Sequence, residues 1–290
     1  MSQDNATSQR PAEDTLRQPK KKSVRRPVSA MIGALLVLFW LFVAAFGNFL
    51  APFDPSDMVS QDIFASYSGT HMLGTDFLGR DMLSRILDGA RYSVGLALIS
   101  TVLACLTGVT LGLLAVLSNT WVDEAVSRIM DALISMPSKM LALVLVSVFG
   151  SSVPLLIIMA VLAYSPGCFR ICRSLALNIA QMEYVLVARS RGESRFYIAA
   201  REMLPNMMGP ILSDFGMRFV FSVLLLSGMS FLGLGVQLPA ADLGSLVREN
   251  ISGLSQGVPA VLWPAISLGT LTIGVNLLID SLSARHRRGF

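Results

Sequence analysis

Residues 28–50 read VSAMIGALLVLFWLFVAAFGNFL, an apolar run of 23 residues without a charged side chain. A helix of this length crosses the ~30 Å hydrocarbon core of a bilayer. A basic cluster at residues 20–26 precedes the run, and Leu50-Ala-Pro-Phe-Asp-Pro follows it where a signal peptide has a small-residue cleavage site. The run therefore predicts a retained first transmembrane helix.

The composition of the whole chain agrees with a membrane protein. Of the 290 residues, 53% are hydrophobic and only 14% are charged, and the mean hydropathy is +0.62. Soluble domains carry about 25% charged residues, so this composition excludes an ordinary soluble enzyme and a disordered chain. The only histidines, His71 and His286, lie outside the apolar runs, which excludes a His-based intramembrane metal site or an HExxH protease.

Five further apolar runs follow the first one. They cover residues 92–122, about 127–150, 153–172, 209–234 and 259–279. In the third of these six spans we expect a kink at Pro137. The predicted fold class is an all-α membrane protein with six transmembrane helices at residues 28–282, between a basic tail at residues 1–27 and a short tail at 283–290.

Most basic residues lie on one side of this map. Residues 1–27 hold seven Lys and Arg, residues 170–201 hold six and the last six residues hold three, which makes 16 of the 23. The positive-inside rule places both termini and residues 173–206 in the cytoplasm, and the loops 51–91 and 237–258 outside. The net charge of +4 thus orients the chain next to membrane lipid and needs no nucleic-acid partner.

A motif on the predicted outer side reads HMLGTDFLGRDMLSR from His71 to Arg85. Thr75 or Asp76 can cap a helix that starts there. Apolar residues then recur on one helical face, at Met82, Leu83, Ile86, Leu87 and Ala90. We predict an interfacial amphipathic helix leading into the second span. It is either a structural collar or a docking site for a soluble partner.

A second motif, on the predicted cytoplasmic side, reads EYVLVARSRGESRFYIAAREMLPN from Glu183 to Asn206. Ala188 and Gly192 are four residues apart and would leave a notch on a helix surface. Three arginines at positions 189, 191 and 195 would rim this notch, and Pro205 is expected to end the helix that precedes it. A notch with a charged rim suits the groove of a partner protein; a solvated loop is the other interpretation.

Two features inside or beside the spans carry less information. Phe231 to Gly235 reads FLGLG, and its two glycines allow either close helix contact or a sharp exit from the membrane. Cys168 and Cys172 share a helix face, but no second ligand pair completes a metal site, so we expect Cys105, Cys168 and Cys172 to be buried thiols that bind no metal.

Charged residues in or near the third and fifth spans face a polar cavity or a partner, because they are costly in lipid. They are Asp131 with Arg128, Lys139, and Asp214 with Arg218. Asp214 and Arg218 are four residues apart and are expected to form a salt bridge. Lys139 has no obvious local partner; it either contacts a substrate carboxylate, snorkels, or pairs with a neighbouring subunit.

Taken together, these segments resemble the inner-membrane permease subunits of ATP-binding-cassette (ABC) importers for dipeptides, oligopeptides and nickel, specifically the second (C-type) permease. The outer motif matches the family pattern HxLGTDxxGRDxxSRxxxGARxS from His71 to Ser93, and Phe231 to Gly235 matches its FLGLG signature. The cytoplasmic motif matches YVxAARxxGxSxxxIxxRHxLPN from Tyr184 to Asn206, apart from Val187 and Glu202. Residues 122–137 also follow VDxxxxRxxDxxxxxP.

The resemblance implies a permease core of the type I importers, in the inner membrane of a bacterium. Such a chain pairs with a second, homologous permease, two cytoplasmic ATPase subunits that use ATP and Mg²⁺, and an extracytoplasmic substrate-binding protein. The permease itself is not an enzyme and binds no cofactor, and this sequence has no GxxxxGK[ST] phosphate loop. The cargo would be di- or oligopeptides, with nickel, a metal chelate or an opine as alternatives.

The resemblance also suggests roles for single residues. Within the coupling segment at 177–206, the residues expected to contact the ATPase are Glu183, Tyr184, Ala188, Arg189, Gly192, Ser194, Leu204 and Pro205. The residues expected to dock the binding protein are Gly74, Thr75, Asp76, Gly79, Arg80, Asp81 and Arg85. The candidates for the pathway are Asp131, Lys139, Asp214 and Arg218.

Two other classes of protein are weighed against this interpretation. A self-contained secondary transporter would show an inverted repeat with paired broken helices, and the sequence has no convincing internal repeat. An intramembrane enzyme would need a His base or a paired acidic metal motif, and the sequence offers neither.

Overall fold

The computed structural model describes residues 26–286. The predicted N-terminal tail lies outside the described residues up to position 25, as do residues 287–290 of the predicted C-terminal tail. The described chain is helical, and its only β-type pairings are two isolated bridges. The long helices are α1 (Arg26–Leu50), α2 (Met82–Leu117), α3 (Thr120–Ser135), α4 (Ser138–Phe149), α5 (Val153–Ile179), α8 (Leu204–Phe231) and α10 (Leu262–His286). The short ones are α6 (Glu183–Ser190), α7 (Arg195–Tyr197), a π-helical segment (Ile198–Met203), α9 (Leu243–Glu249) and two 3₁₀ turns (Ile251–Gln256 and Pro259–Val261).

The number of membrane spans agrees with the prediction of six. Among the described residues, five helical stretches are long and apolar enough to cross a membrane. The pair α3 and α4 supplies a sixth if it is counted as one bent span. The all-α fold class is therefore confirmed.

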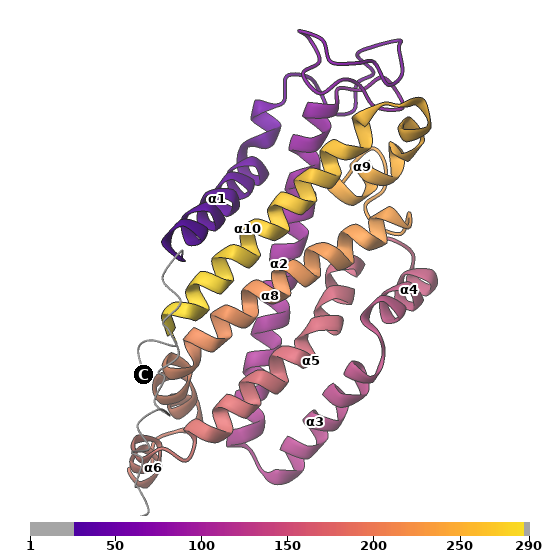
Figure 1. Ribbon diagram of the computed structural model, residues 1–290. Coiled ribbons are helices and arrows are strands. Elements are labelled where there is room, and N and C mark those ends of the chain that lie inside the picture. The colour runs from indigo at the N-terminus through magenta and orange to yellow at the C-terminus, as the bar shows by residue number, and fades with distance from the viewer. Residues whose placement is uncertain (1–25, 287–290) are drawn as a thin grey trace, which may run out of the picture.

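The predicted interfacial helix before the second span is not a separate element. It forms the first turns of α2, which runs without interruption from Met82 to Leu117 (Figure 1). The span was also predicted to reach residue 122, which is wrong. Ser118 is extended, and the backbone carbonyl of Asn119 accepts hydrogen bonds from Val122 and Asp123. A new helix therefore starts at Thr120, earlier than the predicted residue 127.

The third span is broken rather than kinked. Helices α3 and α4 meet at 87°, and Met136 between them has the extended conformation (φ −90°, ψ 129°). The residue before a proline is disfavoured in the helical conformation, and Pro137 has no N–H to donate. Pro137 therefore ends α3, where sequence alone predicted a bend.

Pro205 does not end a helix, contrary to the prediction. The helical path runs from Arg195 through the π-helical segment into α8, with Pro205 in the first turn of α8. Pro205 has no N–H to donate to the preceding turn. A π-helical segment lies directly before it, and such local adjustments are one way a membrane helix accommodates a proline.

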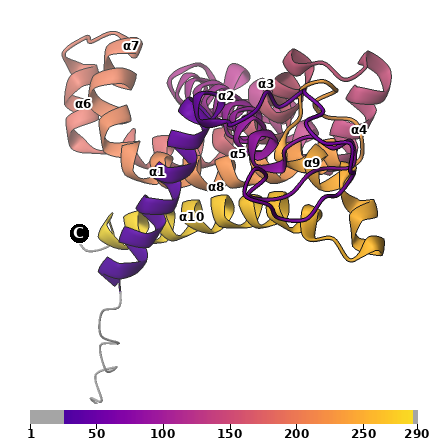
Figure 2. The same ribbon diagram turned by 90° about the horizontal axis from the view of Figure 1, so that it is seen from above.

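Helix α2 lies at the centre of the bundle and packs along α5. At Gly108 a Cβ would lie 2.7 Å from the carbonyl oxygen of Ser165 and 2.9 Å from the amide nitrogen of Phe169. Glycine at this position is therefore what lets the two backbones approach. Helix α8 also packs on α2 and α5, while α1 and α10 pair with each other on one side (Figure 2).

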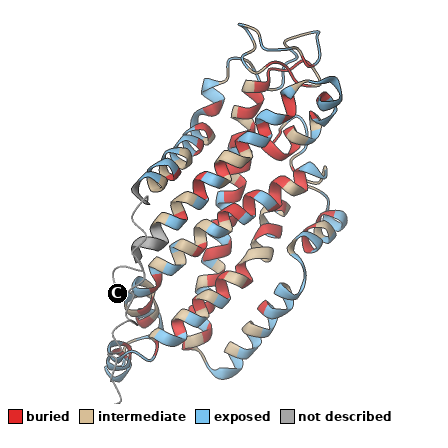
Figure 3. Ribbon diagram, viewed as in Figure 1, coloured by how far each residue is buried: buried red, intermediate tan, exposed pale blue. Residues whose placement is uncertain are grey.

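Buried residues concentrate on α2, α5 and α8, whereas α3 is mostly exposed (Figure 3). On α3 only Met130 is buried. In a chain that spans a membrane, such an uncovered helix faces lipid, water or another protein. This face carries the charged residues of the third span.

Candidate functional site

Three regions hold the residues singled out above: a cap at one end of the bundle, a coupling segment at the other end, and charged groups between them. The outer cap, named for the side that the charge pattern predicts, consists of residues 51–81 and 237–261. The coupling segment consists of residues 177–206. Figure 1 shows α9 of the outer cap and α6 of the coupling segment at opposite ends.

The outer cap is organised around the carboxylate of Asp76. One oxygen accepts hydrogen bonds from the amides of Leu78 (2.8 Å) and Arg80 (2.9 Å). The other oxygen accepts from the Arg80 Nε (2.7 Å) and the Arg85 Nη1 (2.8 Å). Arg85 also donates to Glu249 at 2.6 Å. These ion pairs join the segment before α2 to the end of α9.

The side chains predicted to dock a soluble partner are buried inside this cap. Asp76 is 0% exposed and Arg85 is 2% exposed. Gly74, Thr75, Gly79, Arg80 and Asp81 are buried as well. Gly74 and Gly79 have positive φ and sit against carbonyl oxygens of residues 65 and 60. These residues shape the cap; their side chains do not form its outer surface.

The surface of the outer cap instead carries large apolar side chains, which the sequence analysis missed. Tyr67 is 75% exposed and Met58 is 68% exposed. The others are Ile63, Met72, Leu238, Ile251 and Leu254. The residues lie in loops and in the 3₁₀ turn Ile251–Gln256, without the periodicity of an α-helix, so only their exposure on the folded cap marks them. Exposed apolar side chains of this kind are typical of surfaces that contact another protein or the membrane.

Asp81 is the N-cap of α2, in place of the predicted Thr75 or Asp76. Its carboxylate accepts from the amide of Ser84 at 2.8 Å and is paired with His71 Nδ1 at 3.0 Å. Thr75 instead bonds to the loop at residues 62–65. The sequence permitted each of these caps, and the folding of the loop decided among them. The helix face predicted to meet water is covered too, since Ser84 and Arg85 are buried.

Asp242 caps α9 from a fully covered position. It accepts a hydrogen bond from the amide of Ser245 at 3.0 Å, and Ser245 Oγ receives the amide of Asp242 at 2.9 Å. The residue is 2% exposed. Burial raises the pKa of Asp242, although the amide and hydroxyl of Ser245 and the hydroxyl of Ser230 favour the charged form.

The FLGLG motif makes a sharp exit from α8, one of its two predicted roles. The helix ends at Phe231, and Gly233 has φ +83°. The amide of Gly233 bonds to Ser230 and that of Leu234 bonds to Met229, which satisfies carbonyl groups at the end of the helix. The turn leads the chain into the cap.

The coupling segment has a different geometry from the predicted notch. Ala188 is 5% exposed and points into the protein, and Gly192 lies beyond the end of α6 with φ +79°. Gly192 therefore ends a helix in the left-handed conformation rather than opening a groove. The three arginines at 189, 191 and 195 are exposed.

An apolar cluster anchors the coupling segment to the bundle. Val185 and Ala188 of α6 pack with Ile198 and Met203 of the π-helical segment. The cluster includes Leu113, Leu117, Cys172, Ala176 and Met207 from α2, α5 and α8. The cluster therefore joins α6 to three long helices.

The outer face of the coupling segment is exposed and partly apolar. Phe196 is 82% exposed, Val187 57% and Leu186 48%. Of the predicted ATPase contacts, Glu183, Tyr184, Arg189, Gly192, Ser194 and Pro205 are exposed, Leu204 is partly buried and Ala188 is buried. Figure 2 shows α6 and α7 set to one side of the bundle.

Two of the predicted charged groups in the spans have partners, and one has none. Arg218 Nε donates to Asp214 at 2.8 Å, with both side chains largely buried, which confirms that salt bridge. Asp131 pairs with Arg170 of α5 at 2.7 Å rather than with Arg128. Lys139 is exposed in the first turn of α4 and has no ion-pair partner among the described residues.

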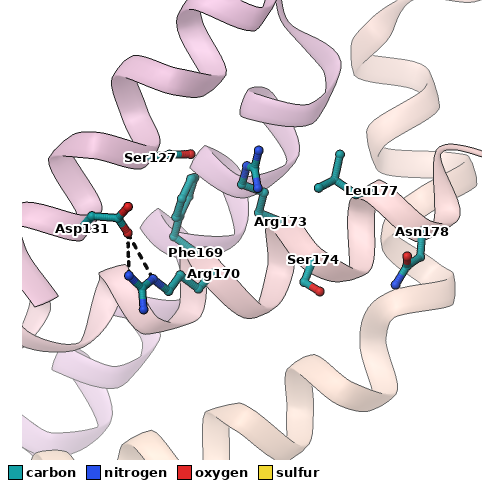
Figure 4. Close-up of a pocket in the computed structure, with 8 residues that line it drawn as sticks. All are labelled: Ser127, Asp131, Phe169, Arg170, Arg173, Ser174, Leu177 and Asn178. Carbon is teal, nitrogen blue, oxygen red and sulfur yellow. Dashed lines mark hydrogen bonds and ion pairs between the residues drawn. The ribbon is translucent and has the colours of Figure 1, made fainter.

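A charged cavity of about 370 Å³ lies between α3 and α5 (Figure 4). Its lining residues are Ser127, Asp131, Phe169, Arg170, Arg173, Ser174, Leu177 and Asn178. Arg173 holds Asp123 through two hydrogen bonds of 2.6 Å. The sequence analysis singled out Asp131 as a pathway candidate. It missed Arg170 and Arg173 as lining residues, because they belong to another helix and only the fold brings them to the cavity.

The structure also brings together three potential metal ligands that their spacing in the sequence did not indicate. Cys105, Cys168 and Asp214 are buried, with ligand atoms within 4.8 Å of one another. The Cys105 and Cys168 sulfurs are 3.2 Å apart, and Cys168 donates to Asp214. The guanidinium of Arg218 already occupies the Asp214 carboxylate and repels a cation. Sequence reasoning paired Cys168 with Cys172 instead, because Cys105 is distant in the chain.

A bundle of membrane-spanning helices, with a compact cap at one end and an anchored segment at the other, defines a multi-pass membrane protein. Comparison with known proteins gives the family. Residues 104–289 match the model of the binding-protein-dependent transport system inner membrane component. The chain therefore belongs to this family and is a permease of an ABC importer in the bacterial inner membrane.

Whole-length relatives support the assignment. The chain is 32% identical to the glutathione transport system permease protein of Pectobacterium atrosepticum, over 90% of this chain and 87% of the relative. It is 30% identical to a di/tripeptide transport system permease protein of Pseudomonas aeruginosa, over 87% and 86%. It is 28% identical to a dipeptide transport system permease protein of Alkalihalophilus pseudofirmus, over 97% and 90%. A permease of this kind works with a substrate-binding protein and ATPase subunits.

Proposed function

We propose that this chain is one of two permeases in an importer for dipeptides and short peptides. The observation that carries the proposal is the coupling segment, which is anchored to three long helices and exposes an apolar face at its end of the bundle. The peptide cargo is supported by the relatives, since transporters for glutathione, dipeptides and di/tripeptides are all similar over most of the chain.

In this proposal the coupling segment contacts an ATPase subunit in the cytoplasm. Exposed side chains of α6 and α7, such as Tyr184, Leu186 and Phe196, enter a groove on that subunit. Two ATPase subunits hydrolyse ATP with Mg²⁺, and the permease itself catalyses no reaction and holds no cofactor. A second, homologous permease completes the pathway and covers part of the exposed face of α3 and α4.

The proposed mechanism is a rigid-body switch between inward- and outward-open states. When the ATPase subunits close on ATP, they pull on α6. The apolar cluster around Ala188 and Met203 passes this movement to α2, α5 and α8. ATP binding thereby favours the outward-open state through its different contacts in the two states.

The outer cap receives the loaded binding protein in this proposal. Asp76, Arg80, Arg85 and Glu249 keep the cap rigid, while exposed residues such as Tyr67 and Met72 make the contact. The residues first predicted to dock thus hold the docking surface in place.

Uptake of labelled dipeptide by cells with and without the gene, expressed with its own operon, tests the cargo. We expect gene-dependent uptake that other dipeptides compete. If the complex assembles and the gene makes no difference to peptide uptake, peptide is the wrong cargo and nickel, a metal chelate or an opine takes its place. A chain that transports after purification without ATPase subunits would instead be a secondary transporter.

The replacement Gly192→Trp tests the coupling role. The site has open space around it, so we expect the protein to insert in the membrane while the side chain blocks the ATPase contact and uptake is lost. Gly150→Trp is the matched control, because Gly150 has a similar φ of +81° and equally open surroundings near the other end of the bundle. Co-purification of ATPase subunits should fall for the first variant only. Normal uptake by Gly192→Trp would refute the coupling assignment.

A further inference from the structure

Asp131 and Arg170, which face the charged cavity between α3 and α5, form an exposed ion pair toward the end of α5 that the charge pattern predicts to be cytoplasmic. Each side chain is 55% exposed, yet both lie in helices that belong to membrane spans. An exposed ion pair facing lipid is costly, and such groups normally face water or another protein. This side of α3 and α5 therefore lines a polar space.

The lining of the cavity is suited to a small polar molecule that carries both signs of charge. Its volume of about 370 Å³ is in the range of ~300–1,000 Å³ for small-molecule sites. Six of its eight lining residues are polar or charged. Ser174 and Asn178 are exposed, and among the described residues neither side chain has a hydrogen-bond partner. These groups are free to bind a ligand.

The balance of charge in the cavity lining narrows the class of ligand further. Arg170 is paired with Asp131 and Arg173 with Asp123, so the cavity has no net charge. A zwitterion can exchange with the exposed Asp131–Arg170 pair: its ammonium meets the carboxylate and its carboxylate meets the guanidinium. No uncompensated charge is created in this exchange. A free peptide is such a zwitterion at neutral pH.

An anionic phospholipid fits this cavity less well. A lipid phosphate favours unpaired basic residues, and both arginines here already hold a carboxylate. Acyl chains would need an apolar groove, whereas Phe169 is 1% exposed and Leu177 is the only other apolar residue of the lining.

We propose that the charged cavity is a transit site for the free termini of a peptide, with Asp131 binding the α-ammonium group and Arg170 the α-carboxylate. Arg173 is fixed by Asp123 and positions the wall of the cavity. Ser174 and Asn178 donate or accept hydrogen bonds along the peptide backbone. The inference rests on the proposed peptide cargo, and it names the groups in this permease that recognise it.

Protection of a cysteine at Ser174 tests the site without measuring transport. The complete complex carrying Ser174→Cys is placed in lipid nanodiscs and labelled with a charged maleimide. The native cysteines are at most 7% exposed, so they add little background. We expect alanylalanine to slow the labelling, and N-acetyl-alanylalanine and alanylalanine amide to protect less, since each lacks one charged terminus.

The matched control is Thr120→Cys, at the exposed start of α3 and outside the cavity; its labelling should not respond to peptide. Asp131→Asn in the Ser174→Cys background should abolish protection by alanylalanine. If that double variant does not assemble, the inference is tested in the Ser174→Cys variant alone, by comparing protection by alanylalanine with protection by the two blocked peptides. Equal protection by free and blocked peptides, or none, overturns the inference.

The labelling rate could instead change with the anionic lipid content of the nanodisc and not with peptide. That result would assign the cavity to lipid and would also overturn the inference. Failure of this inference can be told from failure of the peptide cargo. Gene-dependent uptake of dipeptide without protection of Ser174→Cys removes only the transit site. An assembled complex with no dipeptide uptake removes the cargo, and the transit site with it.

Discussion

Asp242 shows how one buried carboxyl group makes stability depend on pH. Burial raises its pKa above the usual value of an aspartate, so between the usual and the raised pKa the folded state binds more protons than the unfolded state. The free energy of unfolding therefore falls as pH rises through this window, and the full penalty remains at higher pH. The carboxylate offsets part of this cost because it caps the N-terminus of α9.

Replacement of this residue separates its cap from its charge. Asp242→Asn keeps an acceptor for the amide of Ser245 and removes the cost of a buried charge, so we expect higher thermal stability than wild type at neutral pH. The gain should shrink toward about pH 4, where the wild-type carboxyl is protonated. Asp242→Ala also removes the charge but loses the cap, so it should be about 1 kcal/mol less stable than Asp242→Asn. Thermal unfolding of the purified protein at several pH values measures this; a gain independent of pH would contradict it.

At the scale of elements, the contact between α2 and α5 depends on the small residue at their closest approach. In Gly108→Ala the new Cβ meets Cys168 and the backbone of residues 165–169, and backbone atoms cannot move aside as a flexible side chain can. We expect the helices to separate, with a loss of about 1–3 kcal/mol and a lower melting temperature in detergent.

Gly95→Ala on the same helix is the matched control. Nothing lies within 4 Å of a Cβ at Gly95, so the substitution should be neutral or should stabilise by about 0.5–1 kcal/mol, because alanine favours helix. Equal melting temperatures for the two variants would show that the close approach does not limit stability.

At the scale of the whole molecule, six spans place the outer cap and the coupling segment on opposite sides of the membrane. The clustering of Lys and Arg predicts the coupling segment inside. In intact cells, a membrane-impermeant maleimide should label Thr70→Cys in the exposed part of the cap and leave Ser190→Cys in α6 unlabelled. Permeabilised cells should show both. Labelling of Ser190→Cys in intact cells would reverse the assigned orientation.

Much of the fold could be predicted from local sequence. Apolar length is enough to mark a transmembrane helix, because lipid leaves no other way to satisfy the backbone. The span at residues 28–50 is therefore already evident in the sequence, whereas FLGLG allowed either close helix contact or a sharp exit, and the fold decided between them. Ends of helices were less certain: Pro137 was expected to bend its span and breaks it, while Pro205 was expected to end a helix and lies inside a continuous one.

The candidate site was predicted as a set of segments but not as a set of contacts. The order of residues in the two long motifs identified the family and both ends of the molecule. It could not show that Asp76 and Arg85 turn inward to Glu249, or that Arg170 rather than Arg128 meets Asp131. These pairs join segments far apart in the chain, and hydropathy and spacing report only on neighbours.

The sequence by itself thus determined that this protein crosses a membrane with helices, that basic residues gather beside one end of its spans, and that it belongs among ABC importer permeases. These properties follow from hydrophobic length, charge and local motif. Only the tertiary structure decided which polar side chains form buried structural ion pairs and which remain exposed in a cavity. The packing of α3 against α5 and of the cap against α2 sets the exposure of each group, and exposure separates a structural ion pair from one that can bind a ligand.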